Sequence, residues 1–204
     1  MKELNVKATL ITDILGSQPG DPELHSRFIA SKAPDAMKME EEIAAMGVEA
    51  IEERSMTYFH RDKNGDPCLM DYQIKGFFKS AAKVLNKIGG TEEKLEKLKA
   101  FKQAVDLYVF IYGDNDSRFI PFKLPEGGKI GSIQRPLRAS TMQGERITLA
   151  TSETLPAGSE LYFKIVILDD SLLKYVREWL DYGKYNGLGQ WRNASYGRFT
   201  WEEV

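Results

Sequence analysis

The stretch "DDSLLKYVREWLDYGKYNGLGQWRNASYGRFTWEEV" (169–204) predicts a helix, a glycine-rich connection and a strand, in that order. Apolar residues recur at the spacing of one helical face and predict a helix over 169–183: Leu172, Leu173, Val176, Trp179 and Leu180. Four glycines follow within 182–199, although each loses more chain entropy on folding than any other residue. We therefore expect them where the backbone needs a special conformation or a close approach. The segment 196–204 is expected to be a strand.

Apolar patterning and turn residues divide the rest of the chain into short elements. Strands are expected over 4–15, 105–113, 118–124, 146–155 and 159–168, with a hairpin over 55–74. Helices are expected over 35–47, 75–90 and 91–104. The segment 16–23 is expected to be a loop, and 125–145 a long irregular one.

The order of these elements predicts an α+β fold. Without the insertions, the core is strand 4–15, helix 75–88, strands 146–153 and 159–168, helix 171–183 and strand 196–203. This β-α-β-β-α-β order is typical of a ferredoxin-like antiparallel sheet with helices on one face. An alternative takes 105–112 as the second core strand. Because no repeat or linker is visible, residues 1–204 are expected to form a single domain.

Composition and charge limit the classes of function. The 204 residues are 42% hydrophobic and 28% charged, as in an ordinary globular domain. The formal net charge is −2, so a site for a polyanion has to be a local basic patch. The single cysteine, Cys68, allows no internal disulfide. No signal peptide or membrane span is expected, because the apolar runs are too short.

No metal site or cofactor is expected. "GDNDS" (113–117) places Asp114 and Asp116 two residues apart, but it lacks the glycine and the glutamate of a calcium-binding loop. We interpret it as a hairpin turn.

The glycine-rich segment is the first candidate for a binding site. Amide groups exposed in such a turn can form an anion-binding concavity, arginines add charge, and aromatic rings stack on bases. The alternative is a structured turn whose aromatic rings cover the end of the core. The candidate ligand-binding residues here are Gly187, Gly189, Gln190, Trp191, Arg192, Asn193, Tyr196, Gly197 and Arg198.

Three stretches resemble the RAMP superfamily, the RNA-binding proteins of CRISPR effector and processing complexes. "GLGQWRNASYGRF" (187–199) resembles its C-terminal glycine-rich loop, and "ATLITDILGSQPGDP" (8–22) its first strand and the following loop. "YQIKGFFKSAAKVL" (72–85) resembles its strand-to-helix junction, which implies binding roles for Lys75, Gly76 and Lys79. The whole is similar to RAMP-like proteins of phages and prophages, which implies the cytoplasm of a bacterial host cell.

Two further groups of residues are candidates. The segment "QRPLRASTMQGER" (134–146) carries Arg135, Arg138, Gln143 and Arg146, which can contact phosphates and base edges. The alternative is that these arginines pair with surface carboxylates. Of the histidines, His25 follows the first strand and is the candidate general acid or base. His60 is interpreted as structural.

These patterns lead to three hypotheses of function. The first is a protein that binds single-stranded RNA or DNA through the glycine-rich segment, Gly76 and the arginine-rich segment. The second is a phage anti-defence protein that binds or sequesters a small or cyclic nucleotide. The third is a homo-oligomeric assembly protein without a soluble ligand. None of these residues requires the protein to catalyse a reaction.

Overall fold

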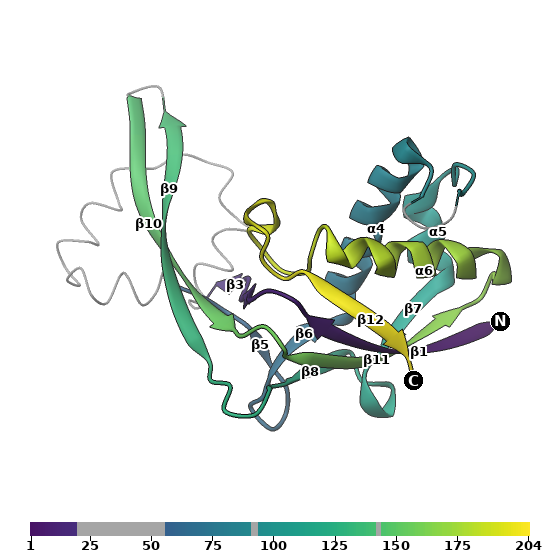
Figure 1. The fold of residues 1–204 in the computed structure, drawn as a ribbon, viewed down its shortest axis with the longest axis horizontal. Coiled ribbons are helices and arrows are strands. Elements are labelled where there is room, and N and C mark those ends of the chain that lie inside the picture. The colour runs from purple at the N-terminus through teal and green to yellow at the C-terminus, as the bar shows by residue number, and fades with distance from the viewer. Residues whose placement is uncertain (20–55, 91–93, 142–143) are drawn as a thin grey trace.

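The computed structural model describes residues 1–19, 56–90, 94–141 and 144–204, and within 137–148 it describes the backbone alone. The helix expected over 35–47 lies outside the described residues. Figure 1 shows helices on one side of a main sheet, and a long hairpin that leaves this body.

Within the described residues, the main sheet has seven strands, and all of its pairs are antiparallel. Its strands lie in the order β12 (Phe199–Glu203), β1 (Lys2–Leu10), β11 (Glu160–Ile167), β8 (Phe119–Lys123), β6 (Pro67–Met70) and β5 (His60–Arg61). The remaining strand, β7 (Val109–Tyr112), pairs with β11 from Lys164 to Ile167, beyond the short stretch that β8 occupies.

The helices cover one face of this sheet. Alternate residues of β1 are buried beneath them, from Leu4 to Leu10, as expected for a strand with one face in the core. α4 (Asp71–Ile88) and α6 (Leu173–Asp181) meet where the rings of Phe78 and Trp179 lie 5.6 Å apart. α5 (Phe101–Tyr108) packs beside α4. Four short 3-10 helices complete the described helical elements: η1 (Asp114–Asp116), η2 (Asp170–Leu172), η3 (Tyr182–Lys184) and η4 (Arg192–Ala194).

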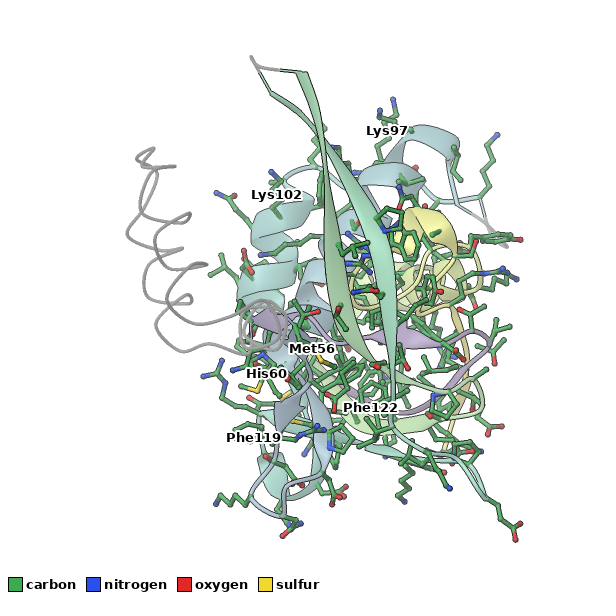
Figure 2. All side chains as sticks on the ribbon, turned by 90° about the vertical axis from the view of Figure 1, so that its left-hand side faces the viewer. Met56, His60, Lys97, Lys102, Phe119 and Phe122 are labelled. Atoms are coloured by element: carbon green, nitrogen blue, oxygen red, sulfur yellow. The ribbon has the colours of Figure 1, made fainter. Side chains whose placement is uncertain are left out.

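A second sheet joins β2 (Ile14–Leu15), β10 (Gly144–Leu155), β4 (Thr57–Tyr58) and β3 (Gln18–Pro19), and β9 (Gly131–Thr141) pairs with β10 alone. β9 and β10 form the long hairpin, which twists as it extends beyond the main sheet (Figures 1 and 2). Through β10 and β11, which follow each other in the chain, this hairpin is joined directly to the centre of the main sheet.

Two predictions about this hairpin are wrong. The segment predicted as an irregular loop contains β9, which was missed because Arg135 and Pro136 interrupt its apolar alternation. The predicted second core strand, 146–153, belongs to β10 in the second sheet. The alternative strand over 105–112 supplies β7 to the main sheet, although its first residues close α5.

Element boundaries also differ from the predictions. α4 begins at Asp71 rather than at Lys75, because Gln73 Oε1 accepts a hydrogen bond from Met70 N (2.8 Å) and Asp71 suits the positive end of the helix dipole. Of the helix predicted over 91–104, the described residues from 94 on are helical only from Phe101, which follows Ala100 in the left-handed conformation (φ 49°). In the described part of the chain, no helix is both long and apolar enough to cross a membrane.

Candidate functional site

A pocket of about 390 Å³ lies between the start of α4 and the glycine-rich segment, and we name it the Gly76 pocket. Four segments that are distant in sequence form its wall: α4, the glycine-rich segment, β5, and Ser17 with β3. Its lining residues are Ser17, Gln18, Pro19, His60, Tyr72, Gln73, Gly76, Phe77, Leu188, Gly189 and Arg192. The structure thus places Gly76 and part of the glycine-rich segment in one wall.

Because Gly76 has no side chain, the backbone of α4 is uncovered at this point. A Cβ atom built on Gly76 would have no heavy atom within 4 Å, so no packing requires the glycine. Tyr72 lies one helical turn earlier on the same face, and its side chain is 50% exposed. A ligand in the pocket can therefore approach the backbone of α4 closely and contact an aromatic ring.

The charge of the Gly76 pocket differs from that of the whole protein. Arg192 lines it, and within the described part of the chain its guanidinium forms no ion pair. None of the described lining residues is an aspartate or a glutamate, although the chain holds 30 of them against 28 lysines and arginines. The described lining of the pocket therefore carries a positive charge from Arg192 and no carboxylate.

His60 and Tyr72 form a pair at the edge of this pocket. Tyr72 Oη and His60 Nε2 are hydrogen-bonded at 2.9 Å, and the two rings meet edge to face with centroids 6.2 Å apart. Burial raises the pKa of Tyr72, as does the nearby carboxylate of Asp71, so the phenol stays protonated at neutral pH. Both residues line the same pocket as Arg192.

Two glycines of the segment have a structural task. A Cβ on Gly187 would lie 2.0 Å from the carbonyl carbon of Gly197, and one on Gly197 would lie 2.0 Å from the carbonyl oxygen of Leu188. Leu188 N donates to Gly197 O (2.8 Å), and Gly197 N donates to Asp13 O (2.7 Å). Gly187 and Gly197 thus allow two backbone segments to cross, with buried Leu188 fixing the crossing to the core.

Other amides of the segment are available to a ligand. In the described part of the chain, the amide nitrogens of Gly189, Trp191 and Arg192 make no hydrogen bond. Gly189 (φ 74°) and Trp191 (φ 56°) are left-handed, and alternation of such residues with right-handed ones is how consecutive amides come to surround an anion. Two of these three residues line the Gly76 pocket.

The side chain of Gln190 forms its hydrogen bonds within the protein. Its Nε2 donates to the carbonyl oxygen of Gly16, to Thr57 Oγ1 (2.7 Å) and to Ser152 Oγ (3.0 Å), so two hydrogens serve three acceptors. Its Oε1 accepts from Arg135 Nη2 (3.0 Å). Gln190 therefore ties the glycine-rich segment to the second sheet, and we assign it a positioning role.

Trp191 and Tyr196 stack on each other rather than standing free. Their ring planes are 12° apart with centroids at 5.1 Å, and the guanidinium carbon of Arg135 lies 4.9 Å from the Trp191 ring. Both rings are half-buried. Asn193, in the same turn, is exposed.

Three other predicted residues point to neighbours away from the Gly76 pocket. Lys75 lies over the ring of Phe110 (4.6 Å), and burial lowers its pKa, while Lys79 pairs with Asp106 (2.6 Å). Arg198 Nε donates to the carbonyl oxygen of Lys184 (2.6 Å). These contacts attach β7 and α5 to α4 and close the turn after α6.

The remaining predicted residues have no described side chain. The backbone places Arg138 in β9 and Arg146 in β10, opposite Ile147 and Ala139. Gln143 and His25 lie outside the described residues.

Sequence reasoning missed Tyr72 as a pocket residue and set His60 aside as structural. The signal for Tyr72 was present, because a helix that begins at Asp71 puts it one turn before Gly76. Nothing local could place His60 there, since it reaches the pocket only through the pairing of β5 with β6.

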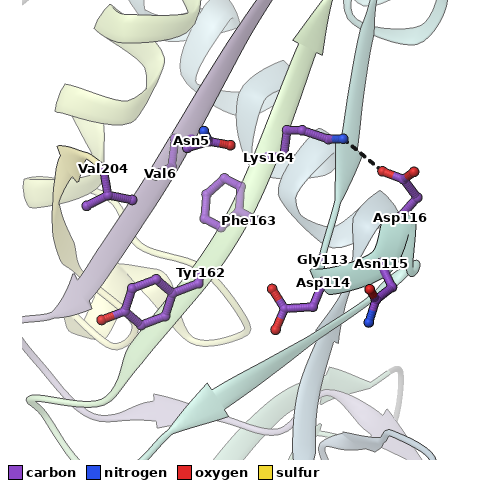
Figure 3. Close-up of a pocket in the computed structure, with 10 residues that line it drawn as sticks. All are labelled: Asn5, Val6, Gly113, Asp114, Asn115, Asp116, Tyr162, Phe163, Lys164 and Val204. Atoms are coloured by element: carbon purple, nitrogen blue, oxygen red, sulfur yellow. Dashed lines mark hydrogen bonds and ion pairs between the residues drawn. The ribbon is translucent and has the colours of Figure 1, made fainter.

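A second pocket, of about 470 Å³, lies on the sheet face opposite the helices (Figure 3). Its lysine, Lys164, pairs with Asp116 (2.8 Å), and on the same face Lys7 pairs with Glu160 (3.0 Å) and Glu202 (3.2 Å). These carboxylates neutralise the cations, so this face suits a polyanion less well than the Gly76 pocket does. Among the described residues, no three metal-ligating side chains come together.

No protein-family model and no curated protein matches the chain, whereas solved structures do resemble it. The crystal structure of Cmr6 from Pyrococcus furiosus is 10% identical over 98% of this chain and 97% of that one, with a TM-score of 0.50. A chain of a Type IV-B CRISPR complex is 10% identical over 100% of this chain and 90% of that one (TM-score 0.49).

A chain of the Type III-B Cmr-beta complex bound to cognate target RNA is 11% identical over 99% of this chain, with a TM-score of 0.45. This chain spans 58% of that protein's length. At such identities the likeness concerns the fold, and the fold of this chain is similar to that of Cmr6.

Proposed function

We propose that this protein binds single-stranded nucleic acid, RNA or DNA, and that the Gly76 pocket holds one of its nucleotides. The observation that carries the proposal is the electrostatics of the pocket: an arginine without an ion pair and no carboxylate among the described lining residues. A phosphate group supplies the negative charge that the arginine of such a site needs as a partner.

Each group of the pocket has a role in this proposal. Arg192 and the amide nitrogen of Gly189 hold a phosphate, because guanidinium and backbone donors suit its oxygens. The exposed ring of Tyr72 stacks on a base, and His60 completes the polar edge. A single strand fits better than a duplex, because its bases are free to leave the stack and enter a concave site.

The fold supports a place in the RAMP superfamily. We propose that β1, α4, β7, β11, α6 and β12 form a ferredoxin-like unit, which the strand order β12-β1-β11-β7 supports. We propose a single RAMP-like domain on this basis, together with the likeness of fold to Cmr6. A nearest relationship to phage and prophage proteins stays a prediction from sequence.

A small nucleotide is the second candidate ligand, because a pocket of about 390 Å³ has the size of a small-molecule site. Assembly into a homo-oligomer without a soluble ligand stays a prediction, which light scattering can test.

The test is fluorescence anisotropy with labelled decamers of uridylate and of thymidylate at several salt concentrations. Arg192→Gln removes the cation of the pocket and is compared with Lys83→Gln, which removes an exposed cation of α4 that does not line it. We expect Arg192→Gln to weaken binding about tenfold and to reduce the salt slope by about 0.7, the value for one phosphate contact in a single strand.

The melting temperature should stay nearly unchanged in both variants, since neither side chain has an ion pair among the described residues. Equal affinities of the two variants would contradict the proposed site. Displacement of the decamers by millimolar uridine monophosphate or cyclic adenosine monophosphate would favour the small nucleotide.

A further inference from the structure

Arg135 on β9 is the most unusual cation of the described structure. Its side chain is only 7% exposed. Nη2 donates to Gln190 Oε1 (3.0 Å), but Nε and Nη1 are buried and have no hydrogen-bond partner in the described part of the chain. A buried guanidinium normally satisfies its donors and pairs with a carboxylate.

Three other arginines of the described structure have a carboxylate partner, which Arg135 lacks. Arg118 pairs with Asp71 (3.1 Å), Arg177 pairs with Glu203 (2.6 Å), and Arg61 pairs with Glu153. The Trp191 ring offers Arg135 a cation–π contact but no hydrogen-bond acceptor. Loss of solvent lowers the pKa of Arg135, which reflects the cost of burying this charge.

The Trp191 ring lies against Arg135, and we name the segment that carries it, residues 191–196, the flap. Trp191 and Ser195 (φ 68°) are non-glycine residues in the left-handed region, so the flap carries backbone strain near each end. The Trp191–Tyr196 stack and the contact of Trp191 with Arg135 hold it closed. Arg192, in the same flap, lines the Gly76 pocket.

We infer that Arg135 is a second phosphate site for the same strand, closed by the flap in the free protein and uncovered when the strand binds. This inference rests on the proposed function, because it takes the ligand to be the nucleic acid held at Arg192. Adjacent residues of the flap contact the two sites, so consecutive parts of one strand can reach both. The ligand then needs at least two linked phosphates, which selects an oligonucleotide over a mononucleotide.

Three variants test the inference in the full chain: Arg135→Met, which keeps the length of the side chain without its charge, Trp191→Phe and Arg192→Gln. We expect Arg135→Met to bind the uridylate decamer about tenfold more weakly, with the salt slope reduced by about 0.7. Its melting temperature should be equal or higher, because an unpaired buried charge is replaced by an apolar chain. Decamer binding should change the tryptophan emission of the wild type but not of Trp191→Phe.

The outcomes separate this inference from the proposed function. Unchanged decamer affinity in Arg135→Met, with weaker binding by Arg192→Gln, overturns the second site alone. A lower melting temperature of Arg135→Met would mean that the guanidinium stabilises the fold by holding Gln190 and Trp191. That result also overturns the second site. Tighter binding of hexaglutamate than of the decamer would identify a site for protein carboxylates instead. A wild-type protein that binds neither decamer overturns both proposals.

Discussion

Replacement of Gly76 by alanine distinguishes a structural role from a binding role. It should raise the stability of the protein, whereas it should weaken the binding of a ligand in the pocket. Gly76 is the sixth residue of α4, within the helix, and a Cβ there has no neighbour within 4 Å. Alanine in a helix interior is more stable than glycine by about 0.5–1 kcal/mol. For a chain of 204 residues this predicts a rise in melting temperature of about 1–4 °C.

The same methyl group enters the Gly76 pocket, where the ligand would contact the bare helix. An extra methyl in a close-fitting site costs about 1–3 kcal/mol, so we expect Gly76→Ala to bind the decamers about tenfold more weakly. Gly76→Gln, which keeps high helix propensity but fills more of the pocket, should bind more weakly still. Scanning calorimetry and anisotropy on the same samples measure both effects. If both variants are stabilised and bind like the wild type, the pocket is not the site.

The remaining predictions concern stability and reactivity. Gly197→Ala should destabilise the protein by about 1–3 kcal/mol in denaturant unfolding, because the new methyl meets the backbone of the crossing segment at a left-handed position; a neutral effect would contradict this packing. Hydrogen bonds from Lys7 and Tyr162 lower the pKa of Glu160, so its contribution is present above the pKa of the unfolded chain and is lost as pH falls through the lower folded value. Glu160→Gln should therefore melt below the wild type at pH 7, and the difference should vanish in acid; a constant difference would refute the linkage. Burial raises the pKa of Cys68 to about 11, so Ellman's reagent should label it at pH 8 only after unfolding.

The parts of the fold that could be predicted are those with strong local periodicity. The spacing of Val176 and Trp179 marks α6, and both residues are buried in the core as that spacing requires. The strand over 159–168 is confirmed as β11, whose residues alternate between buried and half-buried positions. β9 was not found in this way, because Arg135 and Pro136 interrupt the apolar alternation of Ile133, Leu137 and Ala139.

The candidate site was accessible to sequence reasoning only in part. A glycine-rich segment predicts an unusual backbone, and the structure places Gly189 and Arg192 beside Gly76. The sequence alone cannot predict that the Gln190 amide donates hydrogen bonds to Thr57 and Ser152, because these contacts form only in the assembled second sheet. The burial of Arg135 depends on the same tertiary contacts.

The crossing of the glycine-rich segment over residues 11–13 has a consequence for synthesis of the protein. Ile11 N donates to Arg198 O (2.7 Å), and Gly197 N donates to Asp13 O (2.7 Å), so the two partners are separated by most of the chain. Contacts of such long sequence separation form late in folding. A nascent chain on the ribosome cannot complete this crossing until residue 198 has emerged.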